Sequence, residues 1–107
     1  RAQALRRQGD AARLRREDLR TRVELQVREA WLGVGEADAR GVPAREAVAQ
    51  SDENLRITRE LYGAGLVTHT QLLDAIALRV AAVNNRDDAQ FDAELARRRL
   101  ARATGGL

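Results

Sequence analysis

The sequence has no cysteine, methionine or lysine, and it contains only one proline, one histidine and three aromatic residues. Because cysteine is absent and His69 is the only histidine, the sequence excludes disulfide scaffolds, cysteine nucleophiles and metal sites built from several thiolates or imidazoles. Scarce aromatic side chains argue against a thick globular core, because they provide much of the buried area in such cores. No stretch approaches the roughly 20 apolar residues that a transmembrane helix requires.

Alanine, leucine, glutamate and arginine are instead abundant among the 107 residues, as is typical of long helices and coiled coils. We therefore predict an all-α fold. The chain starts at Arg1 without a leader sequence, so we expect it to be a segment of a larger protein.

All nineteen basic residues are arginines, and the formal net charge is +3. Residues 1–28 hold nine arginines against four acids. Arg7, Arg13, Arg16 and Arg20 stand three or four residues from one another or from acids, which is typical of a solvated helix face. We therefore do not expect nucleic acid as a partner, although an Arg-rich nucleic-acid-binding module is an alternative function.

Small and apolar residues recur in a 4-3 rhythm along the first half of the chain, and we call this set the seam. Its members are Val23, Val27, Ala30, Val34, Ala37, Gly41, Ala44, Val48, Ser51, Leu55, Thr58 and Tyr62. This rhythm predicts a long helix over residues 1–62 that packs closely against another helix. A second set, Leu14, Leu25, Leu32 and Ala39, points elsewhere and predicts neighbours on two sides.

Residues 69–104 form a predicted return helix, again with two stripes. One stripe is Leu73, Ile76, Val80 and Val83; the other is Ala75, Leu78, Ala82, Ala89, Ala93, Ala96, Leu100 and Ala103. The pair Gly105-Gly106 is expected to end this helix. Trp31 is expected to anchor the contact between helices.

A tip turn over Gly63–Thr68 is predicted between the helices. If Gly65 is the left-handed residue, then Leu61 and Leu66 form the apolar pair of a Schellman stop. Thr68 followed by Gln71 indicates a capping box that starts the next helix.

Val67 and Leu72 would form the accompanying hydrophobic staple. Such a short link predicts antiparallel helices. Pairing about the turn sets Arg102 opposite Arg28, so residues 1–25, which we call the overhang, would have little or no partner.

Glycines at 33, 35 and 41 and Pro43 interrupt the long helix, and an internal proline costs about 3 kcal/mol. Either the helix is kinked near Gly41–Pro43, or it breaks at 41–43 and the chain folds as three helices. The unbroken rhythm through Gly41 favours the kink.

Five blocks in order resemble one known family. They are Val27-Arg-Glu-Ala-Trp-Leu32, Glu53-Asn-Leu-Arg-Ile-Thr-Arg-Glu60, Tyr62-Gly-Ala-Gly-Leu-Val-Thr68, Leu72-Leu-Asp-Ala75 and Arg99-Leu-Ala-Arg-Ala-Thr-Gly105. Together they span nearly the whole chain and resemble the outer membrane efflux protein family, the TolC-like channels. Tyr-x-x-Gly-x-x-Thr followed by Leu-Leu-Asp-Ala is the most specific part.

The resemblance implies a homotrimer with a β-barrel, absent from this segment, in the outer membrane of a Gram-negative cell and a helical barrel in the periplasm. Residues 1–107 would be the helical pair of one repeat, in a drug efflux or type I secretion channel. Its partners would be a periplasmic adaptor protein and an inner-membrane transporter. The isolated segment is expected to self-associate through its exposed apolar stripes.

The resemblance also implies roles for matching residues. Tyr62 would help to close the periplasmic entrance, and Asp74 would face the lumen. Gln71 stands where the family pattern has a second entrance aspartate, which implies a single acidic ring. The tip that docks the adaptor would comprise Gly63, Gly65, Leu66, Val67 and Thr68, with Val67 in place of a family arginine.

Two further conclusions come from the residues. No group of side chains forms a catalytic constellation, since Asp52-Glu53 and Asp87-Asp88 are adjacent pairs that diverge on a helix. We therefore expect neither enzyme activity nor a cofactor. The main alternative function is the helical hairpin of a periplasmic adaptor, although the usual Arg-Leu-Ser type tip motif is missing.

Overall fold

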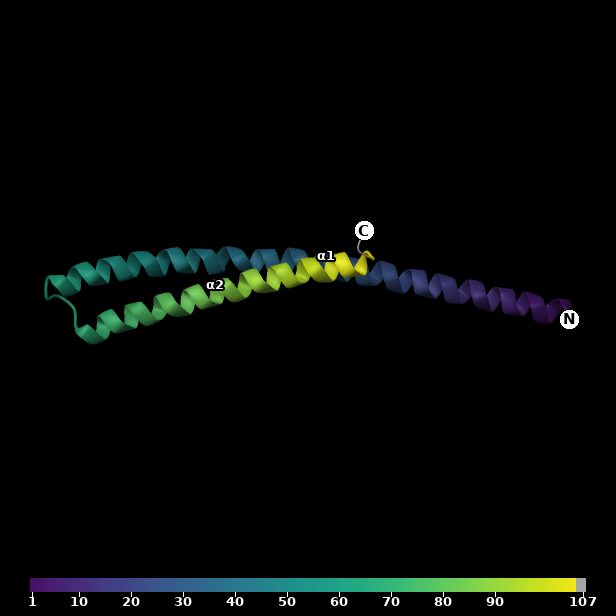
Figure 1. The fold of residues 1–107 in the computed structure, drawn as a ribbon, viewed down its shortest axis with the longest axis horizontal. Coiled ribbons are helices and arrows are strands. Elements are labelled where there is room, and N and C mark those ends of the chain that lie inside the picture. Colours follow the sequence, from purple (N-terminus) through teal and green to yellow (C-terminus); the bar gives the residue numbers. More distant parts are fainter. Residues whose placement is uncertain (106–107) are drawn as a thin grey trace.

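The chain forms two long α-helices joined by a short turn in a computed structural model that describes residues 1–105. Helix α1 spans Ala2–Gly63, and helix α2 spans His69–Ala103. The helices run antiparallel, and the molecule measures 95 × 22 × 15 Å (Figure 1). The predicted all-α hairpin is therefore confirmed, with no strand in the part of the chain that the structure describes.

Helix α1 continues through Pro43 without interruption, so the three-helix alternative is wrong. Pro43 and Ala39 both lie on an exposed side of α1. The carbonyl of Ala39 loses its helical donor to the proline ring, but water can reach it there. A kink at this position stays a prediction.

The middle of the seam is the interface with α2. Its buried members are Ala37, Gly41, Ala44, Val48, Ser51 and Leu55. The two ends of the seam, Val23 and Tyr62, remain 45% and 42% exposed. In the view of Figure 1 the two ribbons diverge toward the turn.

Polar and flexible groups complete this narrow interface. The hydroxyl of Ser51, although buried, donates to the carbonyl of Val48 at 2.9 Å, so its burial leaves no donor unpaired. A Cβ at Gly41 would lie 2.9 Å from Nη1 of Arg45. The guanidinium of Arg45, a residue of α1 itself, therefore occupies the space beside Gly41, and α2 does not.

On α2 the alanine stripe provides the matching surface. Ala75, Ala89 and Ala93 are buried, and Ala82, Ala96, Leu100 and Ala103 are half-buried. Leu78, a member of the same predicted stripe, is 57% exposed and lies outside the interface. The 3-4 rhythm of the buried alanines instead places Arg79 and Arg86 at the edge of the interface.

Large apolar side chains lie outside the interface on both helices. Trp31 is 65% exposed, so the prediction that it anchors the two helices of this chain is wrong. The others include Leu14, Leu25, Leu32, Ile57, Leu73, Val80 and Phe91. Two-helix packing therefore leaves apolar side chains uncovered on each helix. They include Leu25 and Leu32 of the second set on α1, and Leu73 and Val80 of the leucine and valine stripe on α2.

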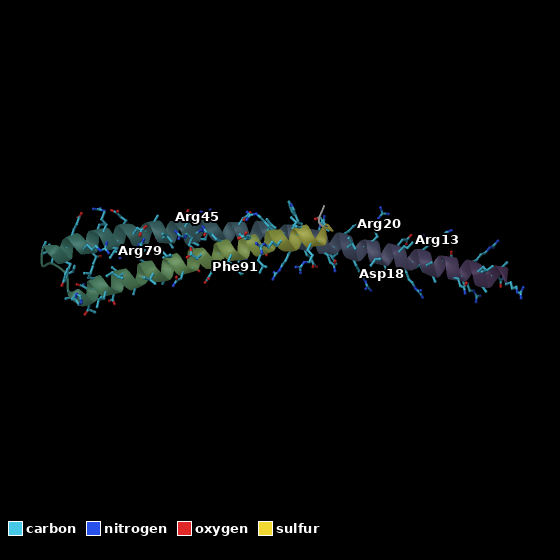
Figure 2. All side chains as sticks on the ribbon, viewed as in Figure 1. Arg13, Asp18, Arg20, Arg45, Arg79 and Phe91 are labelled. Carbon is cyan, nitrogen blue, oxygen red and sulfur yellow. The ribbon has the colours of Figure 1, made fainter. Side chains whose placement is uncertain are left out.

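The overhang projects beyond the end of α2, as predicted. Every residue from 1 to 26 is exposed. Figure 2 places Arg13, Asp18 and Arg20 on this single helix, whereas Arg79 and Phe91 lie in the paired part. Neither α1 nor α2 contains a stretch long and apolar enough to cross a membrane.

Candidate functional site at the hairpin turn

Helix α1 ends in the predicted Schellman motif. Gly65 has φ +77°, a left-handed conformation that favours glycine. The amide of Leu66 donates to the carbonyl of Leu61 at 2.9 Å, and the amide of Gly65 donates to that of Tyr62 at 3.0 Å. These two bonds reverse the chain, and Leu66 in the turn is 72% exposed.

Helix α2 begins with the predicted capping box. The Thr68 hydroxyl accepts from the amide of Gln71 at 3.1 Å, and the Gln71 side-chain oxygen accepts from the amide of Thr68 at 2.8 Å. The two residues thereby satisfy donors that the first turn of a helix leaves unpaired. Val67 and Leu72, the predicted staple pair, are both half-buried.

Tyr62 contacts His69 across the turn. Their ring centroids lie 5.8 Å apart with the planes tilted by 46°. Six residues separate the two positions, so the sequence gives no local signal of this contact. The pair links the last turn of α1 to the first turn of α2.

Asp74 lies three residues after Gln71 and is exposed. Gln71, by contrast, is already engaged by the cap of α2. Of the two residues expected at the entrance, Asp74 thus provides an exposed carboxylate, whereas the Gln71 amide is held in the cap.

All eight predicted site residues lie at one end of the hairpin, remote from the N-terminus (Figure 1). The fold joins Tyr62 to His69 and Thr68 to Gln71, and it exposes Leu66 and Asp74. This end of the hairpin therefore has an exposed apolar side chain in the turn and an exposed carboxylate in the second turn of α2. No group of three or more candidate metal ligands occurs within the described residues.

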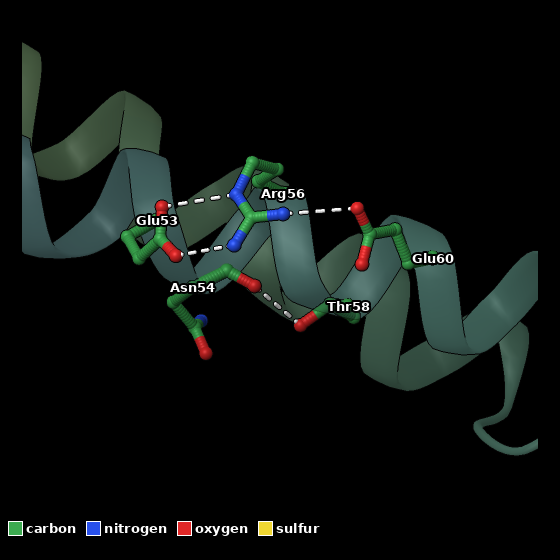
Figure 3. A network of polar contacts seen from close by, with 5 residues as sticks. All are labelled: Glu53, Asn54, Arg56, Thr58 and Glu60. Atoms are coloured by element: carbon green, nitrogen blue, oxygen red, sulfur yellow. Dashed lines mark hydrogen bonds and ion pairs between the residues drawn. The ribbon is translucent and has the colours of Figure 1, made fainter.

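A charged network lies two to three turns before the tip on α1 (Figure 3). The guanidinium of Arg56 donates to both carboxylate oxygens of Glu53, at 2.5 and 3.0 Å, and to Glu60 at 2.9 Å. The hydrogen bond from Arg56 lowers the pKa of Glu53, and the same contact raises the pKa of Arg56. Thr58 donates to the carbonyl of Asn54 at 2.7 Å.

Two ion pairs join the helices. Arg97 on α2 donates to Asp38 on α1 at 2.7 Å, and Arg79 pairs with Asp52. Neither pair was predicted from the sequence, because the partners are 59 and 27 residues apart. The Arg56 network was also missed, although its i, i+3 and i, i+4 spacing is a signal that sequence can supply.

The comparisons with protein-family models, curated proteins and solved structures find no match to this chain. The resemblance to the outer membrane efflux family therefore depends on the sequence blocks and stays a prediction.

Proposed function

We propose that this chain is a wall element of a trimeric outer-membrane efflux or type I secretion channel. It would form part of the periplasmic helical barrel, with the turn as the gated end that docks a periplasmic adaptor and, through it, an inner-membrane transporter. The observation that carries the proposal is an extended hairpin whose helices keep a second set of apolar side chains exposed.

A helix in the wall of a barrel needs neighbours on both sides, whereas a helix of an isolated pair needs only one. Helix α1 uses its seam against α2 and leaves Leu25 and Leu32 exposed, while α2 leaves Leu73 and Val80 exposed. Contiguous exposed apolar surface favours further helix packing. This surface supports lateral contacts with other subunits or repeats.

The turn supports the role of a docking and closing end. Leu66 provides an exposed apolar contact on a backbone held by two hydrogen bonds. Tyr62 would close the entrance, and the exposed Asp74 would contribute one carboxylate per subunit to a ring in the lumen.

The lumen assignment is tested in the full-length channel protein. Removing the charge of Asp74 with Asp74→Asn should weaken block of the single-channel current by added cations, because the ring loses its charge. Asp87→Asn, on the same helix but far from the turn, serves as the control. Identical block in the parent and in Asp74→Asn would refute the assignment.

The docking assignment is tested with Gly65→Val, because a β-branched side chain opposes the left-handed turn. We expect weaker adaptor binding and reduced export, while Gly35→Ala, on α1 far from the turn and with space for a Cβ, leaves both intact. Unchanged export in Gly65→Val would count against docking at the turn. Binding of the turn to a channel rather than to an adaptor would instead favour the adaptor-hairpin alternative.

A further inference from the structure

A groove of about 830 Å³ runs between α1 and α2 at the end of the hairpin remote from the turn. Its floor is apolar and includes Ala30 and Ala37 of α1 together with Leu95 and Ala96 of α2. Ala37 is buried, and the other three are half-buried. Ligand sites in proteins measure roughly 300–1,000 Å³, so the groove has room for a small amphipathic molecule.

Six charged side chains line this groove, three of each sign, and we call them the groove charges. They are Glu29, Glu36, Arg40, Asp92, Arg99 and Arg102. All six are exposed, and within residues 1–105 none of them lies within 4.0 Å of an opposite charge. The groove therefore presents charges of both signs to a ligand.

The opposite side of the hairpin holds the ion pairs between the helices. Asp38 and Asp52, which pair with arginines of α2, follow directly after seam residues. The groove residues Gly33 and Arg40 directly precede seam residues, so they lie on the other side of the seam. Charged side chains therefore meet across the interface on one side of the hairpin and stay apart on the groove side.

The groove charges form three couples of opposite sign across the groove. The antiparallel register set by the two ion pairs brings each acid to about the level of an arginine on the facing helix. The couples are Glu29 with Arg102, Glu36 with Arg99 and Arg40 with Asp92. A ligand group that carries both signs can satisfy both members of a couple, whereas a singly charged group is repelled by one of them.

Gly33 leaves open space inside the groove. A Cβ at Gly33 would meet nothing within 4 Å, whereas one at Gly41 would lie 2.9 Å from Arg45. Glu29 and Glu36 are four and three residues from Gly33, so the three residues lie along one face of α1. The apolar floor is therefore uncovered between two of the carboxylates.

We propose that the groove binds a small amphiphile with a zwitterionic headgroup. The anionic part of the headgroup pairs with an arginine of one couple and the cationic part with the facing carboxylate, while the apolar tail lies on the floor beside Gly33. A purely apolar molecule fits poorly, because it would take the groove charges out of water without giving them partners. The proposal goes beyond the channel function, since this chain alone forms the site.

The groove lies on the same side of α2 as Asp74. Asp74 directly precedes the buried Ala75, and the groove residue Leu95 directly precedes Ala96 of the same alanine stripe. In the channel proposed above, on which this point alone rests, the groove would face the lumen and the amphiphile would be a cargo molecule.

The test uses the full 107-residue chain and three amphiphiles that share a decyl tail. They are a decyl sulfobetaine, which is zwitterionic, decyl sulfate and decyltrimethylammonium, each kept below its micelle concentration. NMR titration should show the sulfobetaine binding at least about fivefold more tightly than either charged amphiphile, with amide shifts at Gly33 and Ala96. Equal or tighter binding of a charged amphiphile overturns the proposal, as does the absence of sulfobetaine binding.

Filling the groove locates the site. Gly33→Leu should weaken sulfobetaine binding at least about tenfold, because the new side chain takes the space of the tail. Gly35→Leu is the matched control, since Gly35 lies on the same helix outside the groove and also has nothing within 4 Å of a Cβ. Thermal unfolding verifies that both variants fold. An equal loss of binding in the two variants overturns the proposal.

A second pair of variants tests the headgroup. In Arg99→Gln/Arg102→Gln two couples lose their positive member, so decyltrimethylammonium should bind more tightly than the sulfobetaine. Arg28→Gln/Arg98→Gln removes the same charge from exposed positions outside the groove and should keep the preference of the parent chain. An unchanged preference in the groove variant overturns the proposal.

These outcomes are separate from those of the channel proposal. Binding is measured on the chain itself, whereas the channel tests measure current block and export in the full-length protein. Failure of the amphiphile to bind leaves the assignments of Asp74 and Gly65 standing, and failure of those assignments leaves the groove site standing.

Discussion

The two ends of α1 have the same rhythm of apolar residues but different surroundings. Between Ala37 and Leu55 the seam is buried against α2, whereas between Leu5 and Leu19 the equivalent stripe is exposed. The covered part has both signs of charge beside its stripe, but the overhang has only arginine there. The apolar residues that follow this rhythm are thus buried within the chain in one part of α1 and exposed in the other.

This contrast shows that a heptad rhythm specifies a face, while the bordering charges specify its partner. Asp38 and Asp52 are matched by arginines of α2, whereas α2 ends near Val23 and leaves the rest of the overhang without a neighbour in this chain (Figure 1). Helix stability in the overhang therefore depends on intrinsic propensity and on i, i+4 pairs, which alone support long helices only marginally in water.

The largest expected difference in the free energy of unfolding is between alanine substitutions of two leucines on the same helix. Leu55→Ala should lower the free energy of unfolding by about 2–3 kcal/mol, because Leu55 is 5% exposed in the interface. Leu19→Ala should change it by less than about 0.5 kcal/mol, because Leu19 is exposed. Urea unfolding followed by circular dichroism measures both. An equal loss would mean that the overhang is covered in solution.

A smaller effect is expected at the turn that makes the pairing possible. Gly65→Val should cost about 1–2 kcal/mol or more, because Gly65 has φ +77°. Gly63→Ala is the matched control: a Cβ there meets nothing within 4 Å and the backbone is helical. Thermal unfolding of the two variants should diverge; the same melting temperature for both would show that the turn does not limit hairpin stability.

The ion pair between the helices should contribute less again. A double-mutant cycle on Asp38 and Arg97 should give a coupling of about 0.5 kcal/mol that falls with salt, because both side chains are about half exposed. The same cycle on Asp18 and Arg22 of the overhang should give no coupling in the free energy of hairpin unfolding, although the two side chains form an ion pair on α1. A coupling energy between Asp38 and Arg97 that does not change with salt concentration would contradict the exposure of this ion pair to solvent.

The smallest effect concerns pH. Arg56 lowers the pKa of Glu53 from its ordinary 4.5, so the pair stabilises the folded chain above about pH 4.5 and this contribution disappears as pH falls through the lower folded-state pKa. An NMR titration should find the pKa of Glu53 below 4.5 in the parent and back near it in Arg56→Gln. No difference between the two would contradict the bidentate contact.

Much of the fold could be predicted from local chemistry. The Schellman stop at Gly65 and the capping box at Thr68 and Gln71 involve residues at most five positions apart, so the sequence contains all the participants. The buried members of the seam were also predicted, because the 4-3 rhythm specifies one helix face.

Other features required the paired helices. Leu78 is a member of a predicted stripe and Trp31 adjoins one, yet both are exposed because the contact between two slender helices covers only a narrow face. Arg79 and Arg97 find their carboxylates on the other helix at a register that no local pattern encodes.

The sequence by itself determined that this chain has a long helix, a left-handed turn at Gly65 and a shorter return helix. Those features depend on propensity, periodicity and hydrogen bonds between near neighbours. Tertiary structure decided which of the apolar stripes is covered and over what length, which arginine meets which aspartate and where α2 leaves α1 uncovered. The reason is that burial and ion pairing depend on the relative position of two helices, and the turn, the arm lengths and the packing of the alanine stripe set that position together.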